Sequence, residues 1–180
     1  IGAVECAMLA LNQHPTKRVR VPNVSAIVSA ASFKEGIEKN IIPKILESVG
    51  SEDITKVKRN AQGIPTSLHW KNNSITYLMS AEQEDVVFEG SVYDFVWVDE
   101  PVRRSIFVAL KRGLMKTGGL FWITCTLLDE PWIYEDFYIP WREGNAKDID
   151  CFEGTTDDNE YLTDEAKHEF KKYLTEDEVQ

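Results

Sequence analysis

The sequence is poor in the residues that build disulfide frameworks and metal clusters. Its three cysteines, Cys6, Cys125 and Cys151, are widely spaced and odd in number. This usage suits a reducing compartment and makes neither a disulfide framework nor a metal cluster. The three histidines are also scattered, without the spacing of a metal site.

Long apolar runs are missing as well. No stretch approaches the roughly 18 apolar residues of a membrane span, and no signal-peptide pattern is present, so no membrane contact is expected. Hydrophobic residues make up 43% of the chain and charged residues 28%, which argues against disorder. The chain has 180 residues, the length of a single domain, and can bury a sizeable core.

Basic residues are scarce in the C-terminal third. Residues 129–180 carry 17 acidic and 5 basic side chains, a net charge of −12, whereas residues 1–128 carry 13 and 15, a net charge of +2. The acidic third will repel a nucleic-acid backbone unless it faces away from it. The small basic clusters at 17–20 and 56–59 are interpreted as solvated faces.

Apolar patterning predicts alternating strands and helices, and hence an α/β fold with a mainly parallel sheet flanked by helices. Helices are expected up to residue 13, from Ser32 with a kink or break at Pro43, over 102–115, around 132–137 and from Thr163, with one helical turn over 81–85. Strands are expected over 24–29, 54–58, 67–70, 74–78, 93–100, 120–124 and 149–152.

The most informative stretch is residues 93–101, where four large apolar residues end abruptly in Asp99 and Glu100. A short continuous apolar run is typical of a central strand of a parallel sheet, and ligands bind off the carboxyl ends of such strands. One acid there can hold Mg²⁺, usually through water, and the next can orient or deprotonate an attacking water. This is the logic of a Walker B element. The alternative is a strand that ends in two solvated acids.

The strand predicted at 120–124, expected to be buried on both faces, ends in Thr124 and continues to Thr126. Neighbouring strands deliver their carboxyl ends to the same crevice, where a hydroxyl can bind the γ-phosphate or the attacking water. The alternative is that threonine simply fits a strand end. Proximity to Asp99 and Glu100 favours the functional interpretation, although no Gly-x-x-x-x-Gly-Lys-Ser/Thr phosphate loop occurs in these 180 residues.

The order of these segments resembles the ATPase domain of the large terminase subunit of tailed phages, the DNA-packaging motor. Four stretches carry the resemblance, at residues 24–35, 72–90, 93–101 and 155–162. It implies a P-loop NTPase core of the ASCE type that is incomplete at its N-terminus. Residues 1–150 would form the partial ATPase core, and residues 151–180 the strand and helix segment that leads out of it.

The resemblance also implies roles for individual residues. Asp99 would be the metal-associated acid, Glu100 the catalytic glutamate, and Thr124 to Thr126 the motif that couples hydrolysis to DNA movement, with ATP and Mg²⁺ as cofactors. Residues 1–5 would follow the phosphate-binding loop directly, and the family's nuclease domain would follow residue 180. We therefore expect a fragment that is inactive alone. A surface role is expected for Arg103 and Arg104.

The parent protein would hydrolyse ATP to drive double-stranded DNA into a viral procapsid in the host cytoplasm. Its partners would be the portal protein, the small terminase subunit and further copies of itself in a ring. Two other functions stay open from the residues alone. One is a helicase-like ATPase, which shares the Asp-Glu strand end, and the other is a non-catalytic nucleotide-fold interaction domain.

Overall fold

The computed structural model describes residues 1–126 and 130–172 of the chain. It divides into two compact units, Ile1–Glu135 and Asp136–Gln180. Among the described helices, none is long and apolar enough to cross a membrane.

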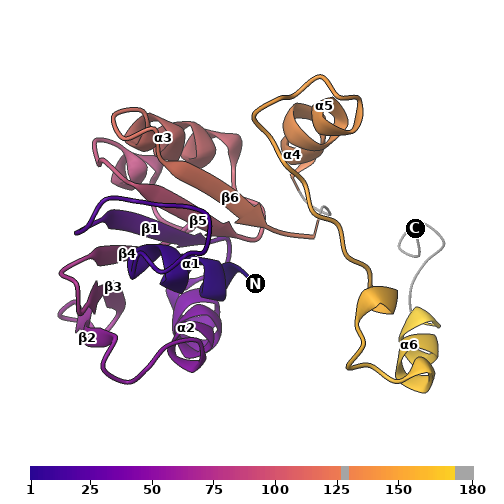
Figure 1. Ribbon diagram of the computed structural model, residues 1–180, viewed down its shortest axis with the longest axis horizontal. Helices are drawn as coiled ribbons and strands as arrows, with labels where there is room; N and C mark the ends of the chain where they lie inside the picture. The colour runs from indigo at the N-terminus through magenta and orange to yellow at the C-terminus, as the bar shows by residue number, and fades with distance from the viewer. Residues whose placement is uncertain (127–129, 173–180) are drawn as a thin grey trace. The chain divides into compact units, whose positions relative to one another are not determined.

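The first unit is built on a six-stranded sheet with the order β2-β3-β4-β1-β5-β6 (Figure 1). The strands are β1 (Val24–Ser29), β2 (Ile54–Arg59), β3 (Pro65–Trp70), β4 (Ile75–Ser80), β5 (Phe95–Asp99) and β6 (Leu120–Thr124). Strands β4, β1, β5 and β6 pair in parallel, whereas β3 pairs antiparallel with both β2 and β4. The predicted α/β fold with a mainly parallel sheet is confirmed.

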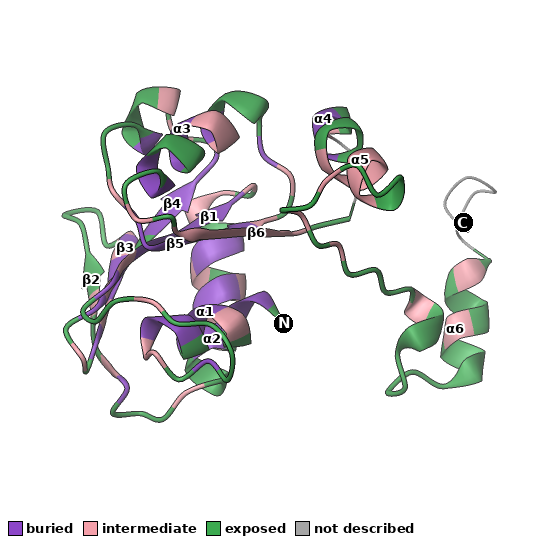
Figure 2. Cartoon of the chain, turned by 45° about the horizontal axis from the view of Figure 1, so that its top comes forward, coloured by how far each residue is buried: buried purple, intermediate pink, exposed green. Residues whose placement is uncertain are grey.

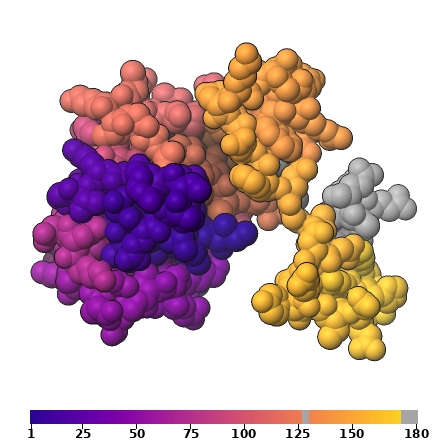
Figure 3. Space-filling view, in the orientation of Figure 1, coloured from indigo at the N-terminus to yellow at the C-terminus, as the bar shows by residue number. Residues whose placement is uncertain are grey.

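Helices cover both faces of this sheet (Figure 2). One face carries α1 (Gly2–Ala10), the π-helix η1 (Phe33–Ile41) and α2 (Ile42–Glu47), and the other carries α3 (Arg104–Leu114) and the short 3-10 helix η2 (Asp85–Phe88). In the space-filling view, the indigo N-terminal residues pack directly on the purple segment that contains α2 (Figure 3).

Strand β5 is buried on both faces, as its continuous apolar run predicts. Phe95 and Trp97 belong to the core on the α1 side, and Val96 and Val98 to the core on the α3 side. This is the alternation that the period of two along a strand imposes. The strand therefore holds Asp99, its last residue, in a fixed position at the carboxyl end of the parallel strands.

The second helix of the chain divides where Pro43 predicts a break. Proline has no N–H for a helix interior but is tolerated in a first turn, and here it lies in the first turn of α2, directly after η1. The Ser32 hydroxyl caps η1 by accepting a hydrogen bond from the Glu35 N–H at 3.2 Å. The Glu35 carboxylate pairs with Lys39 at 2.7 Å.

Strand β6 differs from its prediction. All five of its residues are half-buried, so the expectation of a strand buried on both faces is wrong. The physical reason is position, because β6 is the last strand in the order and pairs with β5 alone among the described strands. Its Trp122 still packs inward, with its ring centroid 5.8 Å from that of Phe95.

Two further local predictions are wrong. The helical turn expected over 81–85 lies later, as η2, and residues 81–82 form a turn in which the Gln83 N–H donates to the Ser80 carbonyl at 3.0 Å. The segment 149–152 forms no strand, and its Phe152 side chain is 95% exposed. No strand is present among the described residues of that unit to pair with it.

The second unit contains α5 (Ile139–Arg142), η4 (Thr156–Asp158) and α6 (Asp164–Lys171), and α4 (Pro131–Ile133) and η3 (Tyr134–Tyr138) lead into it. Thr163 caps α6 as predicted, accepting a hydrogen bond from Ala166 N–H at 3.2 Å. The inner face expected for α6 is absent, since Ala166 and Phe170 are exposed. Leu174, and the capping box predicted at 175–178, lie outside the described residues.

Gly119 precedes β6 at a close approach to the backbone of Asp94, and we expect Gly119→Ala to destabilise the first unit. A Cβ there would lie 2.4 Å from the Asp94 carbonyl oxygen and 2.7 Å from a Leu114 methyl. Because backbone must move, the free energy of unfolding should fall by about 1–3 kcal/mol in urea denaturation. Gly50→Ala is the control, since its Cβ would meet only the movable Glu52 carboxylate. Equal stability of the two variants would contradict this packing.

Candidate functional site

The two neighbouring acids, Asp99 and Glu100, lie at the carboxyl end of the parallel strands. Asp99 is the last residue of β5 and is half-buried, and Glu100 directly follows the strand and is exposed. Strand β5 lies between β1 and β6, and the residues before Asp99 are fully covered by both cores. The acids are therefore held by a rigid strand and still reached by solvent.

Thr124 lies directly beside Asp99. The two residues are paired in the parallel register of β5 and β6, and the Thr124 hydroxyl donates to Asp99 Oδ1 at 3.0 Å. Thr124 Oγ1 in turn accepts a hydrogen bond from Trp97 Nε1 at 2.8 Å. The structure thus brings the predicted pair together and adds Trp97 to it.

Glu100 has an unusual backbone conformation. Its φ of 66° lies in the left-handed region, where a non-glycine residue is uncommon and costs on the order of 1 kcal/mol or more. The Glu100 N–H donates to the Thr124 carbonyl at 2.8 Å, and its carboxylate accepts from the Thr126 N–H at 3.3 Å. All four predicted site residues therefore meet at the ends of β5 and β6.

A cavity of about 580 Å³ opens beside this cluster. Asp99, Thr124 and Trp97 line it from the sheet, the first residues of α1 line it from one side, and Lys44 and Glu47 of α2 from another. The continuous apolar run before Asp99 predicts a core position for Trp97, and no motif of the sequence includes Lys44. No local signal marks either residue, because only the packing of α2 and α1 on the sheet carries them to this edge.

The cavity suits an anion next to a hard cation. Helix α1 begins at Gly2 and its first residues line the cavity, and the N–H groups of a helix's first turn have no intrahelical partner and can meet a phosphate. Asp99 and Thr124 supply oxygen atoms, the ligands that Mg²⁺ prefers. Within residues 1–126 and 130–172, no group of three or more His, Cys, Asp or Glu side chains could hold a metal. A Mg²⁺ at Asp99 would therefore complete its shell with water and phosphate, as is usual for this ion.

Arg103 is engaged away from the acids. Its guanidinium donates to the Ala81 carbonyl at 2.9 Å and pairs with the Asp85 carboxylate at 2.8 Å, and the side chain is half-exposed. These bonds tie the start of α3 to the loop after β4 and hold the pKa of Asp85 below its ordinary value. Arg103 thus has the surface role expected for it.

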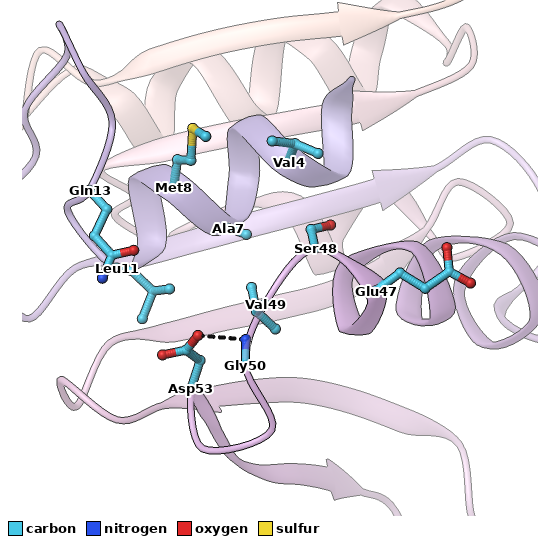
Figure 4. Close-up of a pocket in the computed structure, with 10 residues that line it drawn as sticks. All are labelled: Val4, Ala7, Met8, Leu11, Gln13, Glu47, Ser48, Val49, Gly50 and Asp53. Atoms are coloured by element: carbon cyan, nitrogen blue, oxygen red, sulfur yellow. Dashed lines mark hydrogen bonds between the residues drawn. The ribbon is translucent and has the colours of Figure 1, made fainter.

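A second cavity, of about 330 Å³, lies between α1 and the loop that follows α2 (Figure 4). Val4 and Met8 line it, together with Asp53, whose carboxylate accepts a hydrogen bond from the Gly50 N–H at 2.8 Å. Its lining contains none of the four predicted site residues. We therefore place the candidate site at the larger cavity.

Sequence comparison alone identifies no relative, since no family model matches the chain and no curated protein does. Solved structures do match. Two crystal forms of the large terminase from a thermophilic bacteriophage superpose with TM-scores of 0.72 and 0.70, and a complex of that terminase with ADP superposes with a TM-score of 0.70.

In all three structures the identity is 15%, and the match covers 96% of this chain. It covers 40 or 41% of the terminase, so this chain spans about two fifths of its length. At this identity the likeness establishes the fold. The chain shares the fold of the matched part of this large terminase, as the resemblance of its sequence predicted.

Proposed function

We propose that this chain is part of the ATP-hydrolysing core of a terminase large subunit, which drives double-stranded DNA into a procapsid. The observation that carries the proposal is the meeting of Asp99, Glu100 and Thr124 at adjacent strand ends, beside a cavity of about 580 Å³. The ADP complex of the structurally similar terminase supports a nucleotide as the ligand.

Asp99 is the residue proposed to hold Mg²⁺, directly or through water. Its Oδ1 is fixed by the Thr124 hydroxyl, so the carboxylate presents a defined direction to the cavity. Bound Mg²⁺ would neutralise the charge that develops on the phosphates. The first turn of α1, which lines the same cavity, would offer its N–H groups to those phosphates.

Glu100 is proposed to orient or deprotonate the attacking water. Its left-handed backbone turns it out of the strand direction, and the residue is exposed next to Asp99 without lining the cavity itself. The same carboxylate contacts the Thr126 N–H. A movement of Glu100 during hydrolysis would therefore change its contact with Thr126. We propose this change as the basis of coupling to DNA movement.

The parent protein would work in the host cytoplasm with DNA, the portal protein, the small terminase subunit and a ring of its own copies. Because residues 129–180 carry a net charge of −12, we expect this segment to face away from the DNA. The 180-residue chain contains no phosphate-binding loop motif, and we expect it to hydrolyse ATP weakly or not at all by itself.

In a terminase subunit that contains this chain, Glu100→Gln should lower ATP turnover at least about 100-fold, because it removes the base and keeps the shape. ATP binding, measured by equilibrium titration, should stay within about twofold, since Glu100 is not asked to hold the nucleotide. Glu89→Gln, an exposed acid that precedes β5 and has no part in the contacts of Asp99 and Thr124, is the control. Unchanged turnover in Glu100→Gln would remove Glu100 from this role.

Asp99→Asn should weaken the binding of Mg²⁺ with ADP by about 10–100-fold in calorimetric titration, because a neutral amide replaces the charged ligand. Binding of ADP in the presence of EDTA should change far less. The same Mg²⁺ dependence in the variant and the native protein would show that the cation is held elsewhere.

A further inference from the structure

We propose that the Trp97 indole is a positioning residue for the metal site. Its N–H sets the direction of the Thr124 hydroxyl, and that hydroxyl sets the orientation of the Asp99 carboxylate toward the cation. The inference rests on the proposed function of Asp99, and it gives a polar role to a side chain that the sequence places in the core.

The direction of the chain of hydrogen bonds follows from the donor inventory. An indole Nε1 can only donate, an ionised carboxylate can only accept, and a threonine hydroxyl has one proton to give. With Trp97 Nε1 2.8 Å from Thr124 Oγ1, and Oγ1 3.0 Å from Asp99 Oδ1, only one arrangement satisfies both bonds. Trp97 donates to Thr124, and Thr124 donates to Asp99.

The indole is held too firmly to move aside. Trp97 is 3% exposed, and it lies in register between Ile27 of β1 and Trp122 of β6. The start of α1 rests on its ring, since a Cβ at Gly2 would lie 2.4 Å from Cε2 and Cζ2. Because the Trp97 N–H is already held in place, the side chain loses no conformational entropy when a cation binds at the site.

A tryptophan can be buried in this sheet without a hydrogen bond from its Nε1. Trp122, the neighbour of Trp97 on β6, also points its Nε1 into a buried place and has no hydrogen-bond partner there among the described residues. The two indoles thus form a natural comparison, in which one N–H is linked to Asp99 through Thr124 and the other is not. Because Trp97 also lines the cavity, its packing is separated from its hydrogen bond by substitutions at Thr124, which leave the indole in place.

The decisive experiment follows the binding of Mg²⁺ with ADP in four variants of the chain. We expect Trp97→Phe to weaken Mg²⁺ binding about fivefold, the factor that one ordinary hydrogen bond represents. Thr124→Val should weaken it at least as much, because it removes the link itself. Trp122→Phe should leave it unchanged, and Thr124→Ser, which keeps the hydroxyl, should retain most of the native affinity.

An NMR signal separates positioning from general damage. The chain has five tryptophans, and Trp97→Phe identifies the indole N–H resonance of Trp97 by its loss. This resonance should shift on addition of Mg²⁺ and ADP in the native chain, and should lose that response in Thr124→Val and in Asp99→Asn. Unfolding in urea checks that each variant is folded.

Native Mg²⁺ affinity in folded Trp97→Phe, or equal losses in Trp97→Phe and Trp122→Phe, would overturn the inference and leave the proposed function standing. If the native chain shows no response to Mg²⁺ and ADP that depends on Asp99, the proposed role of Asp99 fails, and the inference fails with it.

Discussion

The parallel pairing of β5 with β6 is the constraint on which the whole site depends. It sets Asp99 opposite Thr124 and lets the Glu100 N–H reach the Thr124 carbonyl. Because alternate residues of β5 enter different cores, a slip of one residue would put Phe95 and Trp97 into the core that now holds Val96 and Val98. Hydrophobic burial thus fixes the register of β5 and β6, and the register fixes the positions of the polar atoms of Asp99, Glu100 and Thr124.

The unfavourable conformation of Glu100 is sustained by its surroundings. Hydrogen bonds from the Ala30 N–H to the Asp99 carbonyl at 2.9 Å, and from Glu100 to Thr124, hold the backbone on both sides. A left-handed non-glycine residue persists only where such contacts over-determine it, and residues of this kind cluster at functional sites. The conformation turns the exposed Glu100 side chain toward the segment after β6, where its carboxylate accepts from the Thr126 N–H.

Small residues let α1 approach the sheet closely enough to form the cavity. The buried side of α1 consists of Gly2, Ala3, Cys6, Ala7, Leu9 and Ala10. Gly2 lies on the Trp97 ring, where any side chain would collide with it. The first turn of α1 is therefore brought beside Asp99 and Thr124. One close contact thus connects the proposed phosphate end of the site to its proposed metal end.

The sequence by itself determined the strand that carries Asp99 and Glu100, the helix break at Pro43 and the α/β class, because these depend on local periodicity and local backbone chemistry. Only the tertiary structure decided that β6 is a half-buried edge, that 149–152 is not a strand, and that Trp97 and Lys44 line the cavity. Each of these depends on which distant segments pack together. The pattern of one segment does not contain that information, since burial and pairing are properties of neighbours far away along the chain.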